Sequence, residues 1–216
     1  MRRHKLTSGS IYHVFTKSIA KFIIFNNNDE ALRMLRTISY YRIMNPRIKF
    51  SKYIVLKDKA RYDKENLLQE KRKLIEIIAY CIMPTHIHLI LKQSKKYGIS
   101  KFMNNILDSY TRYFNTKHKR KGPLWETRFK NILVETDEYL LHLTRYIHLN
   151  PVTANLVDKP EDWLVSSYNE YLLRVGNKVC EYNDVLNINP VSYKKFVDDR
   201  ISYQKELAKI KHLLFD

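Results

Sequence analysis

Residues 81–91 have the sequence Cys-Ile-Met-Pro-Thr-His-Ile-His-Leu-Ile-Leu, and this stretch decides the fold. Apolar and β-branched residues on both sides of Pro84-Thr85 predict a hairpin with strands over 75–83 and 86–93. Side chains alternate across a strand, so His86 and His88 point to one face while Ile87 and the leucines point into a core.

A strand face with two neighbouring histidines can hold a divalent metal, because neutral imidazole is a good ligand. The alternative is that His86 and His88 are ordinary, partly exposed histidines. The dipeptide spacing does not decide between these interpretations.

Hydrophobic periodicity along the rest of the chain predicts an α+β fold. The order β-α-β-β-α-β, followed by another helix, is typical of a ferredoxin-like (RRM-like) antiparallel sheet with helices on one face. The expected elements are a strand over 10–18, a helix from about Asn26–Asp29 to Asn45-Pro46, the hairpin, a helix over 99–117, a strand over 128–135 and a helix over 137–150, capped by Thr136 or Asp137 and closed by Pro151.

Two regions are harder to assign. Residues 53–56 suggest a short strand, and the charged stretch 57–73 suggests a helix or an excursion. A further helix is expected from about Ser192 to His212. We therefore predict one domain over 1–170 and a C-terminal helical extension over 171–216.

Composition points to a polyanionic partner. Lys and Arg outnumber Asp and Glu by 39 to 22, which gives a net charge of +17. Such a charge self-repels unless it meets a polyanion, so nucleic acid is the first candidate and a solvated basic surface the alternative. The sequence has no long apolar segment that would indicate a membrane partner. No apolar signal core follows the basic N-terminus. Cys81 and Cys180 are expected to be reduced cytoplasmic thiols.

Tyr146 and Asn150 lie four positions apart in the predicted helix, so they share a helix face. An amide oxygen suits a hard ion such as Mg²⁺ or Mn²⁺ beside two histidines. A tyrosine hydroxyl one turn away could attack a phosphate polarised by that ion. The alternative is a packed tyrosine and an asparagine that only ends the helix.

Six segments of the chain form a recognisable series: Tyr12–Lys17, Tyr80–His88, Gly122–Phe129, Tyr139–Leu141, Tyr146–Val152 and Glu161–Tyr168. Together they resemble the REP-associated tyrosine transposases, which belong to the single-tyrosine branch of the HUH endonucleases (IS200-like transposases). The resemblance covers roughly residues 8–170. Residues 50–73 are longer and more charged than the usual connection, and the tail after about 175 matches poorly.

This resemblance implies a metal-dependent endonuclease and strand transferase acting on single-stranded or hairpin DNA through a 5′-phosphotyrosine. It implies His86 and His88 as metal ligands, Tyr146 as nucleophile and Asn150 as third ligand. It further implies a monomer or homodimer in the cytoplasm, associated with the nucleoid. No residue is expected to bind an organic cofactor, and the sequence does not identify a base for the Tyr146 proton.

Basic residues near the site are candidates for phosphate contacts. Tyr110, Tyr113 and Trp125 could stack on unpaired bases, although Tyr110 and Trp125 fit a core position better. The predicted DNA-binding residues are Lys117, Lys119, Arg120, Lys121 and Arg128.

Three other functions compete with this one. The first is a catalytically idle nucleic-acid-binding protein on the same fold, which would not need the full set of His86, His88, Tyr146 and Asn150. The second is an RNA-acting protein, but the chain lacks an aromatic RNA-recognition signature. The third is a zinc hydrolase, but no Glu or third His lies at familiar spacing.

Overall fold

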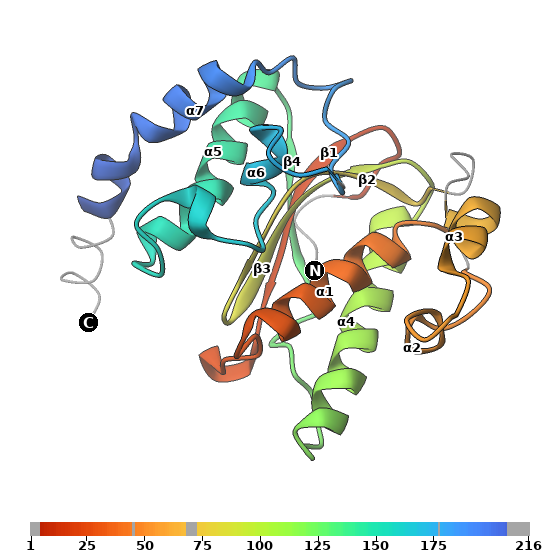
Figure 1. Cartoon of the computed structure of the whole chain (residues 1–216). Coiled ribbons are helices and arrows are strands. Elements are labelled where there is room, and N and C mark those ends of the chain that lie inside the picture. The colour runs from red at the N-terminus through yellow and green to blue at the C-terminus, as the bar shows by residue number, and fades with distance from the viewer. Residues whose placement is uncertain (1–4, 45, 68–72, 177, 207–216) are drawn as a thin grey trace.

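A four-stranded antiparallel sheet lies at the centre of the molecule (Figure 1). The structure is a computed structural model and describes residues 5–44, 46–67, 73–176 and 178–206. The spatial order of the strands is β2-β3-β1-β4, which is that of a ferredoxin-like sheet, so the predicted fold is confirmed. The strands are β1 (Ile11–Lys17), β2 (Ile75–Met83), β3 (His86–Gln93) and β4 (Lys130–Val134).

The register of β1 against β3 determines which side chains meet. Phe15 lies opposite His88, and His13 lies opposite Ile90. Paired residues project to the same side of a sheet, so His13, Phe15 and the two histidines of β3 share one face.

Helices cover both faces of the sheet (Figure 1). The two helices within the βαββαβ unit, α1 (Asn28–Tyr41) and α4 (Gly98–Lys117), lie together on one face, as predicted. The following helix, α5 (Asp137–Thr153), crosses the other face and contacts β2 and β4. It is accompanied there by α6 (Tyr168–Tyr171) and α7 (Pro190–Asp198).

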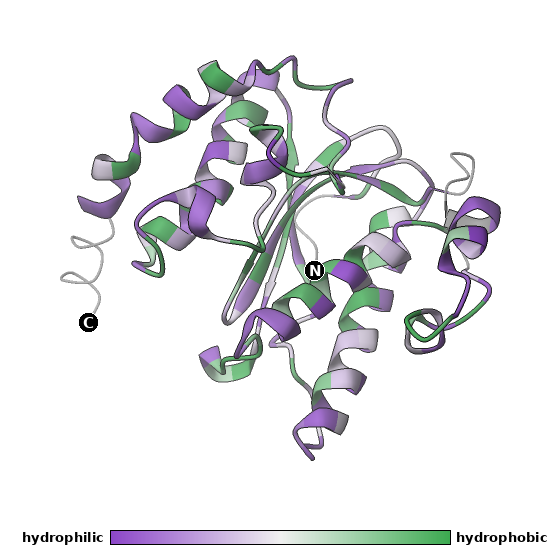
Figure 2. Ribbon diagram, in the orientation of Figure 1, coloured by the Kyte–Doolittle hydropathy of each residue, from purple (hydrophilic) through white to green (hydrophobic). Residues whose placement is uncertain are grey.

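Local sequence explains where α1 and α5 begin. The Asn27 side chain accepts a hydrogen bond from Glu30 N at 3.0 Å, and Thr136 Oγ1 accepts one from Tyr139 N at 3.1 Å. Each satisfies a backbone donor that a helix start leaves free. Figure 2 shows α1 and α4 banded in hydrophobic and hydrophilic residues, as expected for helices that cover a sheet.

The segment after α5 covers the outer edge of β2. Ile82 N donates to Val165 O at 3.0 Å, and Ser167 N donates to Tyr80 O at 3.0 Å. Further along, Glu181 N donates to Ile77 O at 2.7 Å. These bonds satisfy backbone groups that an edge strand leaves unpaired.

The C-terminal part packs against α5 and shares the core. The ring centroids of Tyr171 and Tyr182 are 4.1 Å apart, and those of Tyr171 and Tyr193 are 4.9 Å apart. The helix predicted over 192–212 begins at Pro190 and turns at 199–200. Residues 201–206 are again helical, and 207–212 lie outside the described residues.

The strand predicted over 53–56 was wrong. The chain forms a short helix, α2 (Phe50–Tyr53), and continues in turns. Phe50 and Tyr53 lie three positions apart and pack on Tyr40, at centroid distances of 5.3 and 4.6 Å. Tertiary packing outweighs the β propensity of this stretch.

The remaining elements are short. The charged stretch 57–73 contains α3 (Lys59–Tyr62) and a π-helical turn, η2 (Asp63–Leu67), while 68–72 lie outside the described residues. The described residues also include the 3₁₀ turns η1 (Ile19–Lys21) and η4 (Pro160–Asp162).

Pro151 does not close α5, contrary to expectation. The helix continues through it to Thr153, and Ala154 N donates to Asn150 O at 2.9 Å. Proline removes one N–H, but its fixed φ is compatible with a helix, and here the loss does not end the element. Asn150 therefore lies inside the last turns of α5 rather than at its end.

Candidate active site

His86 and His88 lie at the start of β3, and their side chains project from the sheet face that α5 covers. Their ring centroids are 5.0 Å apart, with the planes at 87°. Nδ1 of His86 is 3.0 Å from Thr85 Oγ1, within hydrogen-bond distance. Among the described residues, Nε2 of each ring is left without a hydrogen-bond partner.

A third imidazole, His13 of β1, belongs to the site and was not predicted. Its Nε2 is 2.9 Å from Nδ1 of His88, and the ring is 6% exposed. Within the predicted first strand, side-chain alternation puts His13 on the opposite face from Tyr12 and Val14, and this was the available signal. The pairing of β1 with β3 was the missing information, because it brings together residues 75 positions apart.

Tyr146 of α5 stands edge-on over these rings. Its ring centroid is 6.0 Å from that of His88 and 6.5 Å from that of His13. The side chain is half-exposed, and its hydroxyl has no hydrogen-bond partner among the described residues. One chain therefore brings the tyrosine and the histidine pair together.

Burial keeps all three imidazoles neutral. Desolvation lowers the pKa of His13 to about 4. Desolvation, together with repulsion from His13 and His86, lowers the pKa of His88 to about 2. Desolvation and the Lys17 charge also lower the pKa of His86. Metal binding requires neutral imidazole, so the rings are in the correct protonation state at neutral pH.

The pKa of the Tyr146 phenol is shifted upward, which is the opposite of what a nucleophile needs. Desolvation raises its pKa above the ordinary value of 10, because burial disfavours the phenolate. The tyrosine is therefore a neutral phenol at physiological pH, and its ionisation needs help from a neighbouring positive charge or a base.

Asn150 lies one helical turn beyond Tyr146 and is half-buried. Its Nδ2 atom is buried and has no hydrogen-bond partner within the described ranges. A half-turn of the amide group exchanges Nδ2 with Oδ1, so an oxygen can occupy that position. Such an unpartnered atom fits a residue whose amide oxygen binds a metal.

The donor set fits a divalent ion in part. Two neutral imidazole nitrogens and one amide oxygen suit Mg²⁺ or Mn²⁺, with remaining positions open for water or substrate. Across the described residues, no three His, Cys, Asp or Glu side chains come together in a metal-binding arrangement. Asn150 offers a neutral amide oxygen as a further donor.

A cavity of about 270 Å³ opens beside the two histidines. Lys17 and Lys130 supply positive charge, and Glu126 pairs with Lys17 at 3.2 Å. The sequence indicated none of these three residues as part of the site. They come from β1, the loop before β4 and β4, and only the folded sheet brings these segments together. Together they form a polar rim around the imidazoles.

The predicted DNA-binding residues occupy different settings. Lys117 is 2.8 Å from Oε1 of the buried Glu30, and Arg120 donates to Asn115 Oδ1, Gly122 O and Pro123 O. Both therefore hold the protein's own structure. The side chains of Lys119, Lys121 and Arg128 are exposed.

Two of the aromatic candidates are structural, as the sequence favoured. Tyr110 is buried and donates to Ile24 O at 2.6 Å. Trp125 packs against the core and its Nε1 lies 3.1 Å from Thr111 Oγ1. Tyr113 instead lies beside Arg33, whose guanidinium is 4.8 Å from the ring centroid.

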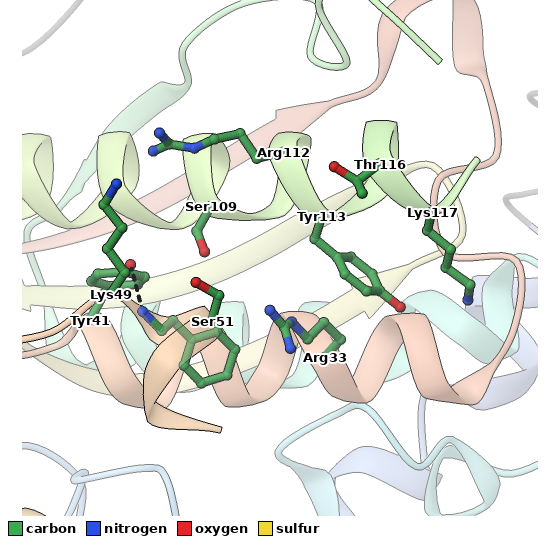
Figure 3. Close-up of a pocket in the computed structure, with 10 residues that line it drawn as sticks. Arg33, Tyr41, Lys49, Ser51, Ser109, Arg112, Tyr113, Thr116 and Lys117 are labelled. Atoms are coloured by element: carbon green, nitrogen blue, oxygen red, sulfur yellow. Dashed lines mark hydrogen bonds between the residues drawn. The ribbon is translucent and has the colours of Figure 1, made fainter. Parts of the chain in front are cut away.

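Tyr113 lines a second hollow on the other face of the sheet, between α1, α2 and α4 (Figure 3). The hollow has a volume of about 530 Å³ and carries four cations but no carboxylate in its lining. The cations are Arg33, Lys49, Arg112 and Lys117.

Comparison with known proteins identifies the family to which the chain belongs. The family described as "Transposase IS200 like" matches residues 38–150, more than half of the chain. The fold and this match define the chain as a transposase. It belongs to the IS200-like transposase family, as the sequence resemblance predicted.

Two relatives show the similarity in more detail. A protein of Haemophilus influenzae described as a REP-associated tyrosine transposase is 27% identical over 135 residues, which cover 54% of this chain and 77% of the relative. A solved structure of a REP-associated tyrosine transposase bound to a REP hairpin has a TM-score of 0.52 and 16% identity. The alignment covers 88% of this chain and 98% of the solved chain, and the likeness shows a shared fold.

Among the described helices, none is both long and apolar enough to cross a membrane.

Proposed function

We propose that this transposase cleaves and rejoins single-stranded DNA through a covalent bond between Tyr146 and a 5′ phosphate. The observation that supports this most strongly is the position of the Tyr146 ring, whose centroid lies 6.0 Å from that of His88, on the face where Nε2 of His86 and of His88 has no hydrogen-bond partner among the described residues. Binding alone would not require a half-exposed phenol above two neutral imidazoles.

His86, His88 and Asn150 would hold a divalent ion, Mg²⁺ or Mn²⁺, which when bound polarises the scissile phosphate and favours the phenolate. Tyr146 Oη then attacks phosphorus. The new bond joins Oη to phosphorus, and the bond from phosphorus to the 3′ oxygen breaks. The phenol loses its proton, and the departing 3′ oxygen gains one.

The covalent intermediate keeps one phosphodiester for each one broken. A free 3′-hydroxyl can therefore attack the phosphotyrosine and rejoin the strand without ATP. Lys17 and Lys130, on the rim of the cavity, are positioned to contact phosphate oxygens near His86 and His88.

We propose hairpin-associated single strands as the substrate. The support is the net charge of +17 and the relationship to a transposase whose structure contains a REP hairpin. Lys119, Lys121 and Arg128 are the exposed members of the predicted DNA-binding set.

The test is incubation of the protein with a labelled DNA hairpin and Mn²⁺, followed by denaturing electrophoresis. The parent protein should form a covalent adduct, and peptide mapping should locate it on Tyr146. Tyr146→Phe should abolish the adduct while leaving DNA affinity within a few fold, because the hydroxyl contributes little contact area.

Tyr139→Phe is the matched control, since Tyr139 is also half-exposed on α5. It should react like the parent. An adduct that persists in Tyr146→Phe would assign the nucleophile elsewhere. A parent protein that binds the hairpin but never reacts would favour a catalytically idle binding protein.

A further inference from the structure

His13 and His88 form a hydrogen bond between two buried imidazoles. Nε2 of His13 and Nδ1 of His88 are 2.9 Å apart, and the rings are 6% and 9% exposed. A hydrogen bond between two ring nitrogens contains one proton, so one ring donates and the other accepts. The direction of this bond fixes which nitrogen of His88 carries its proton.

We propose that His13 is a positioning residue that accepts the Nδ1–H of His88 and thereby holds the Nε2 lone pair of His88 toward the metal. The inference rests on the metal role given to His88 in the proposed function. If His13 donated instead, the proton of a neutral His88 would lie on Nε2, and that nitrogen could not bind an ion.

The position of His13 favours a role in orienting His88 over direct binding of the metal. Its Nε2 is already engaged by His88, and the described residues contain no metal-binding group of three His, Cys, Asp or Glu side chains. Partners that bind the second nitrogen of a ligand histidine orient its ring and fix its tautomer.

The backbone makes His13 a rigid support. β1 lies between β3 and β4, so His13 is held opposite Ile90 on one side and Ile132 on the other. Its ring packs against Phe15 at a centroid distance of 5.0 Å. Thr85 has the corresponding position for His86, with Oγ1 3.0 Å from Nδ1. Both candidate ligands thus have Nδ1 occupied, and neither Nε2 has a hydrogen-bond partner in the part of the chain that the structure describes.

The first measurement is the tautomer of His88 in the metal-free protein, observed by imidazole ¹⁵N NMR at a pH where the rings are neutral. The parent should show the proton on Nδ1. His13→Gln, which keeps an acceptor, should preserve that tautomer, and His13→Leu should shift His88 toward the Nε2–H form. A parent with the proton on Nε2 would overturn the inference.

The second measurement is calorimetric titration with Mn²⁺ in the absence of DNA. His13→Leu should weaken Mn²⁺ affinity by about 10- to 100-fold, the usual effect of losing such a partner. His13→Gln should stay within a few fold of the parent. Equal affinities for parent and His13→Leu would contradict a positioning role.

Two controls separate this effect from others. Val14→Ala removes buried apolar volume from β1 on the opposite face, so it should lower thermal stability without changing the His88 tautomer or Mn²⁺ affinity. His88→Ala tests the proposed function itself: if Mn²⁺ affinity survives that change, the metal site is wrong. If His88→Ala abolishes binding but His13→Leu has no effect, only the role of His13 fails.

Discussion

Asn150 is the residue whose role depends most on its exact chemistry. Its buried Nδ2 atom has no hydrogen-bond partner among the residues that the structure describes, and α5 continues past it, so a role as a terminal cap does not explain its side chain. An oxygen at this position would link the location of the metal to that of the nucleophile, one turn away on the same helix.

Asn150→Ala should therefore lower the cleavage rate and raise the Mn²⁺ concentration needed for half-maximal rate. Asn150→Asp and Asn150→Gln should retain more activity than Ala, since each keeps an oxygen donor. The measurement is the cleavage rate across a Mn²⁺ series. If Ala lowers only the thermal stability and leaves the metal requirement unchanged, Asn150 does not belong to the site.

Among the elements, α5 is the one that must be held precisely, and α7 holds it. Tyr193 of α7 donates to Thr144 Oγ1 at 2.9 Å, and its hydroxyl is 2.7 Å from Nδ1 of the buried His148. Arg145 lies under the Phe196 ring, 4.0 Å from its centroid. Thr144 and His148 flank Tyr146 along the helix, so α7 fixes the segment that carries the nucleophile.

Tyr193→Phe should destabilise the protein by about 1–3 kcal/mol, because it leaves buried polar partners without a hydrogen bond. Urea unfolding measures this change. Tyr203→Phe is the control, since Tyr203 is half-exposed, and its effect should stay within about 0.5 kcal/mol. Equal stabilities for the two variants would show that the buried network does not hold α7 to α5.

A second junction joins α1 to α4 and depends on pH. Burial would raise the pKa of Glu30, but hydrogen bonds from Lys117, Asn26 and His118 lower it to about 2. The folded pKa is below the unfolded value, so the stabilisation is complete above about pH 4.5 and is lost as pH falls toward 2. Glu30→Gln should therefore unfold more easily than the parent at pH 7, and the difference should shrink in acid.

Denaturant unfolding of both proteins across this pH range gives the comparison. A difference that stays constant from pH 7 to pH 3 would show that the Glu30 carboxylate contributes no pH-dependent stabilisation. For the same reason, Lys117 is unsuitable for a test of DNA binding by mutation. Its removal would leave Glu30 a buried carboxylate with fewer partners and so change stability.

At the scale of the whole molecule, the excess positive charge should make DNA affinity strongly salt-dependent. Replacing Lys119, Lys121 and Arg128 together by Gln should flatten the slope of log affinity against log salt by roughly 0.7 for each phosphate that the protein no longer neutralises. These three side chains are exposed, so the fold should not suffer.

The comparison variant is Lys49→Gln with Arg112→Gln, which removes two exposed cations from the hollow in Figure 3. Affinity measured over a salt series for both variants locates the DNA path. A slope that changes only in the comparison variant would place the DNA on the α1–α4 face, away from the loop before β4.

The sequence predicted what depends on local pattern and missed what depends on pairing. Alternation gave the hairpin of β2 and β3, and helical spacing put Tyr146 and Asn150 on one face. His13 joined the site only through the register of β1 on β3. The strand expected at 53–56 failed because Phe50 and Tyr53 find aromatic partners on α1, which no local pattern indicates.

The cover on the edge of β2 has a consequence for how the chain is made. The last strand of the sheet ends at Val134, but the segments that bond the outer edge of β2 are Val165–Ser167 and Glu181. A growing polypeptide can complete the sheet while that edge is still bare, and bare edges recruit strands from other chains. The edge of β2 is therefore open to pairing with other chains until the C-terminal part has been synthesised and has docked on it.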